Sequence, residues 1–207
     1  MVAIDGRALG RRGVQTRARL LEATEKLLDD YGIRDLRVVE IARLVGTSPA
    51  TFYQYFRDVE DAVLALAEVA GDDVAPLARY LDQPWRAGKG LDDARALVDG
   101  FFDYWDRHRP VLRTRNLAAQ EGDPRFREIR NRALEPFLTR LSTRIAASQR
   151  EGLVARELSP VAASAALVAL IERMAAFHHD LEPIGVDRPA LVETTARIIF
   201  QTVVGSG

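Results

Sequence analysis

The sequence predicts an all-α protein. Apolar residues recur at helical spacing along most of the chain, and no segment has the features of a strand. Proline follows a capping residue at Asp123-Pro124 and Ser159-Pro160, which indicates the start of a helix, and Gly32 and Gly152 fall where helices should end. The chain has 207 residues, of which 47% are hydrophobic, so it can form one large domain or two small ones with a substantial core.

Residues 1–14 are expected to form a flexible basic arm. The first 20 residues carry five arginines against a single acid, Asp5; the arginines are Arg7, Arg11, Arg12, Arg17 and Arg19. Such an arm can reach the phosphate backbone or the minor groove of DNA, and a solvated tail is the alternative. A first helix should follow from a cap at Thr16 to about Tyr31, and Gly32 should end it.

Residues 38–56 predict two short helices joined by a tight turn at Gly46-Thr47. Ser48-Pro49 suits the cap and the first turn of the second helix. Phe52 and Phe56 should face a core, whereas the opposite side is small or hydrogen-bonding and uncharged: Ala50, Thr51, Tyr53, Gln54 and Tyr55. A helix with an apolar back and a polar front fits the major groove of DNA, and an ordinary helical hairpin is the alternative.

Six further helices are expected after this segment. The first of them begins at a cap at Asp58 and reaches about Tyr80, with a disturbance at Gly71 and Pro76. The others are predicted at about residues 91–108, 110–120, 124–149, 160–181 and 188–204, which makes nine helices in all.

The two-helix segment resembles the helix-turn-helix of the TetR family of bacterial repressors. The family pattern has Ile-Ala, a hydrophobic-Gly turn, a Ser, a small residue, an apolar-Tyr pair and a closing Phe. Here these places hold Ile41-Ala42, Val45-Gly46, Ser48, Ala50, Phe52-Tyr53 and Phe56. The resemblance covers roughly the first third of the chain. It implies a nine-helix fold with a DNA-binding domain over residues 15–57 and a ligand-binding and dimerisation domain over residues 58–207.

Two positions depart from the family pattern. Val59 stands where the family commonly has a Lys that meets a DNA phosphate, so this contact is expected to be lost or moved to Arg57. Arg37 stands where a Thr often caps the second helix, and its guanidinium can contact phosphate instead. Both changes are expected to alter affinity for DNA and to leave the fold intact.

The start of the second short helix supplies the expected base-reading residues. Gln54 can bond adenine through both amide atoms, and Thr51 can donate or accept a hydrogen bond. Pro49 and Ala50 can meet a thymine methyl group, and Ser48 lies beside them. The expected phosphate contacts, which set the register on DNA, are Arg37, Thr47, Tyr53 and Tyr55.

The densest aromatic stretch predicts either a ligand pocket or plain core packing. The resemblance places the family's pocket among the middle helices, where Phe101, Phe102 and Trp105 fall. The full expected ligand-binding set is Trp85, Phe101, Phe102, Trp105, Arg109, Met174 and Phe177. A small apolar or amphipathic ligand suits such a wall. Eight arginines in residues 106–132 leave an anionic ligand such as an acyl-CoA as a sharper alternative to a solvated, ion-paired face.

A homodimer through residues 160–204 is expected, because two apolar helices can form a four-helix bundle across a two-fold axis. Alanines on the first helix permit close approach. The apolar contacts should come from Leu167, Leu170, Met174, Ile198 and Val203.

Other classes of protein find little support in the sequence. The chain has no cysteine, no apolar run that approaches the ~20 residues of a membrane span, and no signal-peptide core, so we expect a cytoplasmic protein without a membrane partner. No catalytic group and no cofactor motif is apparent. His178-His179-Asp180 suggests a metal site, but adjacent helical residues point about 100° apart, so no metal site is predicted.

The expected function is therefore a ligand-responsive repressor that binds a palindromic DNA operator as a homodimer. A regulator of the same fold without a small-molecule ligand is one alternative. A helical enzyme or carrier whose N-terminal motif is accidental is the other. The sequence leaves the ligand, the operator, and the choice between repressor and activator open.

Overall fold

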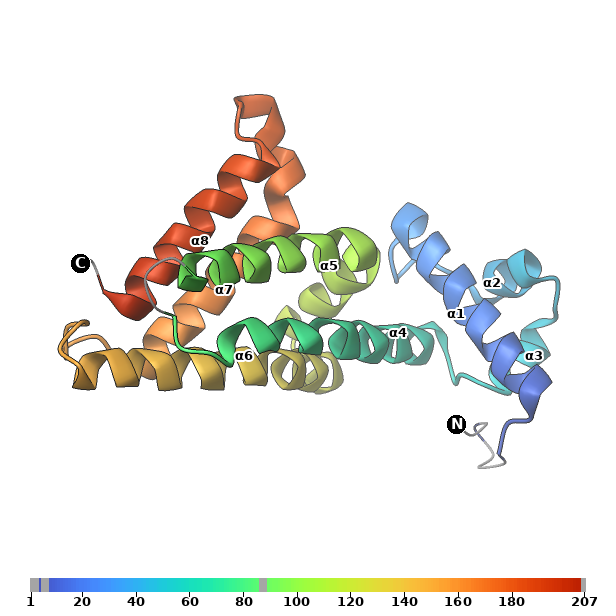
Figure 1. Cartoon of the computed structure of the whole chain (residues 1–207). Coiled ribbons are helices and arrows are strands. Elements are labelled where there is room, and N and C mark those ends of the chain that lie inside the picture. The colour runs from blue at the N-terminus through green and yellow to red at the C-terminus, as the bar shows by residue number, and fades with distance from the viewer. Residues whose placement is uncertain (1–3, 5–7, 86–88, 206–207) are drawn as a thin grey trace. The chain divides into compact units, whose positions relative to one another are not determined.

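The structure is a computed structural model that describes Ile4, residues 8–85 and residues 89–205 (Figure 1). Within these residues it contains eight α-helices, two short 3-10 helices (η1 and η2) and no β-strand, so the all-α prediction is confirmed. The chain divides into two compact units: an N-terminal unit of Met1–Gly71 and His108–Arg130, and a C-terminal unit of Asp72–Arg107 and Asn131–Gly207.

The two units do not divide at residue 57, where the sequence placed the domain boundary. Three helices contribute residues to both units: α4 (Val59–Val74), α5 (Lys89–Gln120) and α6 (Pro124–Arg150). Most of α4, the end of α5 and the start of α6 belong with the helix-turn-helix, because their apolar side chains complete its core.

The N-terminal unit is built on four helices: α1 (Arg11–Tyr31), α2 (Val38–Val45), α3 (Pro49–Tyr53) and the larger part of α4 (Val59–Val74). Buried side chains of these helices and of the adjoining parts of α5 and α6 form one apolar cluster. It includes Leu20, Leu28, Ile41, Val45, Phe52, Phe56, Val63, Ala67, Val111, Phe126 and Ile129. This cluster fixes the orientation of the short helices α2 and α3, which are too short to be stable alone.

Helix α1 begins earlier than the sequence indicated. It starts at Arg11 after Gly10, so residues 11–14 are helical and do not belong to an extended arm. Thr16 lies inside the helix, where its hydroxyl donates to the Arg12 carbonyl at 3.0 Å instead of capping the first turn. Arg7, the other basic residue expected in the arm, lies outside the described residues.

The C-terminal unit contains the remaining elements: η1 (Ala75–Leu81), the first part of α5 (Lys89–Gln120), the second part of α6 (Pro124–Arg150), α7 (Pro160–Leu181), η2 (Glu182–Ile184) and α8 (Arg188–Val204). The predicted cap of α7 is present, because the Ser159 hydroxyl accepts from the Ala162 amide. Asp187 caps α8 in the same way at 2.8 Å from the Ala190 amide. Both helices carry proline in the first turn, where its missing N–H is not needed.

Helix α5 replaces two of the nine predicted helices. The sequence predicts a break before Pro110, but the chain stays helical from Lys89 to Gln120 with a kink at His108, where φ is −115° and ψ is 19°. Pro110 lacks an N–H and its ring crowds the carbonyl four residues earlier, which bends the helix without ending it. The kink falls at the boundary between the two units.

Helix α7 leaves an apolar face uncovered in the single chain. Pro160–Ile184 is long and apolar enough to cross a membrane by length and composition, contrary to the expectation that no apolar run approaches this length. An apolar helix of a soluble protein satisfies the same criterion. Only 39% of its most apolar stretch is buried. The exposed positions include Val161, Ala162, Ala165, Ala166, Ala169 and Phe177.

Candidate DNA-binding surface and effector cavity

The turn between α2 and α3 has the geometry that the sequence predicted. Gly46 is left-handed, with φ 73° and ψ 37°, a conformation that glycine adopts without the strain of a side chain. The Thr47 amide donates to the Ala42 carbonyl at 2.9 Å, which closes the end of α2. The Ser48 hydroxyl accepts from the Thr51 amide at 3.3 Å and so caps α3.

Helix α3 is anchored by two phenylalanines. Phe52 and Phe56 are buried, and their ring centroids lie 5.3 Å apart. The Arg17 guanidinium of α1 lies 5.0 Å from the centre of the Phe56 ring, and Arg19 donates to the Val45 carbonyl at 2.8 Å. The expected helix over residues 48–56 is shorter, because regular α-helix ends at Tyr53 and Phe56 lies just after the following turn. The anchor is therefore as predicted, although the helix is only five residues long.

None of the nine expected DNA-binding residues is buried. Arg37, Ser48, Ala50, Tyr53 and Gln54 are exposed, and Thr47, Pro49, Thr51 and Tyr55 are partly exposed. Two of them have local roles as well. Thr51 shares a 3.1 Å hydrogen bond with the Ser48 hydroxyl, and Tyr55 packs against the core of the N-terminal unit.

A hollow of about 580 Å³ adjoins α3 in the N-terminal unit. It is lined by residues from the start of α2, the start of α3 and the start of α4, among them Arg34, Arg37, Pro49 and Tyr53. Arg34 was not among the nine expected DNA-binding residues, although a basic residue shortly before α2 is visible in the sequence. Its guanidinium also contacts Glu121 at 2.7 Å.

Arg57 is engaged within the protein. Its guanidinium lies 2.9 Å from a carboxylate oxygen of Asp61, and its amide donates to the other oxygen at 3.1 Å. Partial burial alone would raise the pKa of Asp61, but the hydrogen bonds from Arg57 outweigh burial and lower that pKa below its usual value. A phosphate contact moved from Val59 to Arg57 would have to compete with this ion pair.

The C-terminal unit contains an open cavity of about 960 Å³. Its lining comes from η1 and the turn after it, the start of α5, the second half of α6 with the turn that follows it, and the end of α8. The apolar members include Leu81, Trp85, Leu91, Leu153, Phe200 and Val203. The Trp85 and Phe200 rings stack with centroids 6.3 Å apart. A cavity of this size and composition suits a small amphipathic molecule.

Arg144 supplies a cation to this cavity. Its guanidinium lies 5.5 Å from the centre of the Trp85 ring, and its Nε donates to the Leu81 carbonyl at 2.9 Å. Within the described chain its hydrogen bonds go to this carbonyl and not to a carboxylate. Partial burial lowers the pKa of the Arg144 guanidinium, although Arg remains charged under all ordinary conditions. By contrast, the neighbouring Arg140 is paired with Asp82 at 2.8 Å.

Of the seven residues expected to bind the ligand, Trp85 lines this cavity and the other six do not. Phe101, Phe102 and Trp105 are buried in the core of the C-terminal unit, where Phe101 meets Phe137 at 5.0 Å and Phe102 meets His178 at 5.1 Å between ring centroids. The last three are scattered: Met174 is half-buried on α7, Phe177 is exposed beneath the Arg173 guanidinium, and Arg109 belongs to the N-terminal unit.

The Trp105 indole is a special case within the aromatic core. It is 2% exposed, and its N–H has no hydrogen-bond partner among the described residues. A buried donor without an acceptor costs about 1–3 kcal/mol, so an acceptor at this position would stabilise the fold. The aromatic cluster of Phe101, Phe102 and Trp105 is therefore a second candidate position for a ligand that carries a hydrogen-bond acceptor.

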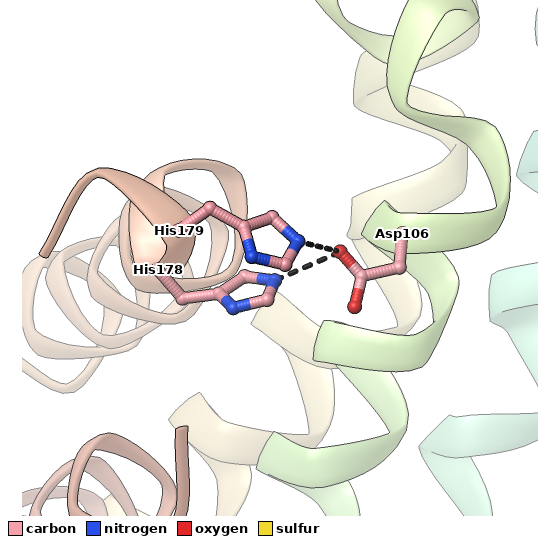
Figure 2. A group of neighbouring side chains, drawn as sticks. All are labelled: Asp106, His178 and His179. Atoms are coloured by element: carbon pink, nitrogen blue, oxygen red, sulfur yellow. Dashed lines mark hydrogen bonds and ion pairs between the residues drawn. The ribbon is translucent and has the colours of Figure 1, made fainter. Parts of the chain in front are cut away.

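The two adjacent histidines do converge, contrary to the sequence-based expectation. His178 and His179 near the end of α7 both direct their imidazoles toward Asp106 of α5 (Figure 2). The distances from Asp106 Oδ1 are 2.8 Å to His178 Nε2 and 3.3 Å to His179 Nε2. The 100° between adjacent Cβ directions describes the backbone alone, but the side chains bend toward each other and bring the ring centroids to 3.9 Å.

A helical chain with a capped, core-anchored helix-turn-helix and a second unit that contains a cavity has the architecture of a DNA-binding transcriptional regulator. Comparison with protein-family models identifies the family. Residues 20–66 match "Bacterial regulatory proteins, tetR family", and residues 77–207 match "Tetracyclin repressor-like, C-terminal domain". The chain belongs to the TetR family.

Solved structures agree on the fold. The chain is similar to the fatty acid degradation regulator FadR from Bacillus halodurans, with 17% identity, a TM-score of 0.68, and coverage of 94% of this chain and 97% of that one. FadR from Bacillus subtilis, in complex with stearoyl-CoA, has 16% identity, a TM-score of 0.65, and coverage of 92% and 99%. AibR, in complex with isovaleryl coenzyme A and operator DNA, has 16% identity, a TM-score of 0.66, and coverage of 93% and 100%. At these identities the likeness establishes a shared fold.

Proposed function

We propose that this protein is a ligand-responsive transcriptional repressor that acts in the cytoplasm and binds a roughly palindromic DNA operator as a homodimer. The observation that carries the proposal is α3, which rests on buried Phe52 and Phe56 and presents an exposed, uncharged polar front. An uncharged front can approach base edges in the major groove, where hydrogen bonds and methyl contacts report sequence.

The residues of this front have distinct proposed roles. Gln54 is exposed after the last turn of α3 and reads a base, with Ser48, Pro49, Ala50 and Thr51 beside it. Tyr53, Thr47, Tyr55 and Arg37 hold phosphates and set the register on the duplex. The hollow lined by Arg37 and Tyr53 is well placed to follow the DNA backbone beside the groove, and Arg34 adds a second cation to it.

Dimerisation is proposed through residues 160–204. The alanine-rich face of α7 is exposed in the single chain, and Ile198 of α8 is 42% exposed. Of the apolar residues first expected at the interface, Leu170 and Met174 are half-buried and remain candidates. Leu167 and Val203 are buried within the chain itself, so they support α7 and α8 from behind.

The effector is proposed to be amphipathic and to bind in the C-terminal unit. The cavity offers an apolar wall around Trp85 and Phe200, and Arg144 can pair with an anionic group. FadR of Bacillus subtilis and AibR were crystallised with acyl-CoA molecules, which combine an apolar chain with phosphates. Acyl-CoA compounds are therefore the first candidates to test, and the aromatic cluster of Phe101, Phe102 and Trp105 remains the alternative place for the acyl chain.

Selection from a library of random duplex DNA tests the proposal, because it requires no assumption about the operator sequence. The repressor should enrich two inverted half-sites whose centres lie about one helical turn, roughly 34 Å, apart. A regulator that lacks a small-molecule ligand would enrich the same sites but would not be released by any acyl-CoA. Enrichment of no sequence at all would contradict the proposed operator binding.

A further inference from the structure

We infer that Asp106, His178 and His179 form a binding site for a divalent metal ion of the zinc class, which joins α5 to α7 within the C-terminal unit. The three side chains each offer one ligand atom, and these atoms all lie within 4.8 Å of one another. This site is independent of the effector cavity and of the DNA-binding surface.

The distances fit a single ion. Zinc binds imidazole nitrogen and carboxylate oxygen at about 2.0–2.2 Å, so neighbouring ligand atoms on one tetrahedral zinc lie roughly 3.4 Å apart. Asp106 Oδ1 already lies 2.8 Å from His178 Nε2 and 3.3 Å from His179 Nε2 (Figure 2). Small side-chain rotations place all three around one ion, with the backbone unchanged.

The surroundings of His179 suit a metal ligand. Metal binding requires both Nε2 atoms to be unprotonated, so each imidazole carries its proton on Nδ1. In His179 this Nδ1 lies 3.1 Å from Glu182 Oε1, which can accept that proton's hydrogen bond and hold the ring in place. A carboxylate on the far nitrogen of a ligating histidine is the usual arrangement at protein zinc sites.

The local charge favours a cation. Asp99, Asp103 and Asp106 follow one another along one side of α5, and Arg188 of α8 contacts all three. One guanidinium therefore faces three carboxylates, and Glu182 adds a fourth acid beside His179. Arg188 approaches Oδ2 of Asp106 at 3.3 Å, whereas the histidines face the other oxygen, Oδ1, so the arginine and the ion would use different oxygens.

Solvent can reach the site from one side. The His178 side chain is 2% exposed, whereas Asp106 is 32% and His179 is 53% exposed. An ion can therefore enter from the His179 side and keep water in the remaining coordination positions. Three protein ligands with at least one open position are typical of accessible zinc sites.

Zinc titration of the full-length protein tests this inference. The protein is purified without a histidine tag, stripped with a chelator and titrated with zinc chloride in a calorimeter, and thermal unfolding is followed in parallel. We expect one zinc per chain and a zinc-dependent rise in the unfolding temperature. Asp106→Asn and His179→Gln should each weaken binding by roughly tenfold or more, and Glu182→Gln should weaken it by about tenfold through the second-sphere contact.

Two matched controls isolate the site. Asp180→Asn removes an equal charge next to His179 without removing a ligand, and His108→Gln removes the remaining histidine of the chain. Both should bind zinc like the wild type. Three results would overturn the three-residue site: no bound zinc in the wild type, wild-type affinity in both Asp106→Asn and His179→Gln, or weakened binding in only one of these two ligand variants. Unfolding curves recorded without zinc show whether each variant is folded, so a loss of binding is not confused with a loss of structure.

Discussion

Arg125 in the first turn of α6 donates a hydrogen bond to Glu60 in the first turn of α4, with 2.8 Å between Nη2 and Oε2. The same guanidinium contacts Asp123 at 2.7 Å, and the hydrogen bond from Arg125 lowers the pKa of Asp123 below its usual value. Arg125 therefore connects the start of α6 to the start of α4, the helix that directly follows the helix-turn-helix. Within the N-terminal unit, a change at α6 can reach α4 through this contact.

The Arg125–Glu60 pair is expected to contribute little to stability. Both side chains are about half exposed, so a double-mutant cycle with Arg125→Gln and Glu60→Gln should give a coupling free energy of about 0.2–1 kcal/mol, which added salt reduces. Urea unfolding followed by circular dichroism measures it. A coupling of several kcal/mol that ignores salt would contradict the interpretation of this pair as a surface contact.

An arginine on the exposed face of α7 should separate the dimer. Ala169 is exposed in the single chain, and Ala169→Arg places a charge where the proposed interface needs a small residue. We expect the wild type to sediment as a dimer at micromolar concentration and the variant as a folded monomer. Ala155→Arg, an exposed alanine outside residues 160–204, serves as the control and should leave the dimer intact. A wild-type monomer, or a variant that still dimerises, would show that the interface lies elsewhere.

Binding measurements on variants can show whether the effector occupies the cavity or the aromatic core. If the anionic group of an acyl-CoA pairs with Arg144, Arg144→Gln should weaken its binding by about 1.5–3 kcal/mol, the worth of a hydrogen bond to a charged group. Arg150→Gln, on the same helix but outside the cavity, should have no effect. Quenching of tryptophan fluorescence by acyl-CoA compounds from isovaleryl to stearoyl measures both. A response that survives Arg144→Gln and disappears in Phe102→Ala would instead place the ligand in the aromatic cluster.

Acid should weaken the contact between α5 and α8. Glu193 accepts from Arg95 at 2.6 Å and from Arg197 at 2.5 Å; the hydrogen bond from Arg95 is the largest influence, and together they lower the pKa of Glu193 to about 2. An unfolded Glu titrates near pH 4.3, roughly two units higher, so this group stabilises the fold above that pH. The stabilisation is lost as the pH falls from about 4.3 toward 2.

Unfolding temperatures across this pH range test the acid effect. Glu193→Gln should unfold at a lower temperature than the wild type at pH 7, and the two curves should converge as the pH approaches 2. Glu157→Gln, an exposed acid without this pair, is the control. A difference between Glu193→Gln and the wild type that stays constant from pH 7 to pH 2 would mean that the pair does not shift the titration of Glu193.

The helix-turn-helix could be predicted because its determinants are local. The turn at Gly46, the cap at Ser48 and the two phenylalanines Phe52 and Phe56 lie within a few residues of one another. Each can therefore be recognised from a short stretch of sequence. Local signals gave a wrong prediction for α5, because a proline indicates a disturbed helix but does not determine whether the helix bends or ends. Whether Pro110 kinks or ends the helix depends on how the helix packs against its neighbours, and this packing cannot be derived from the sequence pattern.

The cavity and the histidine cluster could not be predicted from the sequence, because both are formed by residues that lie far apart in the chain. Trp85, Arg144 and Phe200 lie on separate elements, and no pattern in the sequence connects them. The aromatic stretch on α5 was conspicuous for its density, yet most of it packs into the core, which was the alternative left open. For His178 and His179, the helical wheel describes Cβ directions only, so it could not foresee two side chains that bend toward a carboxylate on another helix.

Operator binding by variants of the recognition helix tests the central claim most directly. Fluorescence anisotropy is measured at fixed salt on the selected operator, on the same operator with one altered half-site position, and on unrelated DNA. Tyr53→Ala should weaken binding to all three, because it removes a phosphate contact. Gln54→Ala should lose roughly 1–3 kcal/mol on the cognate operator and little on the operator altered at the base that Gln54 reads. Unchanged affinity in both variants would contradict the assignment of α3 as the DNA-reading helix.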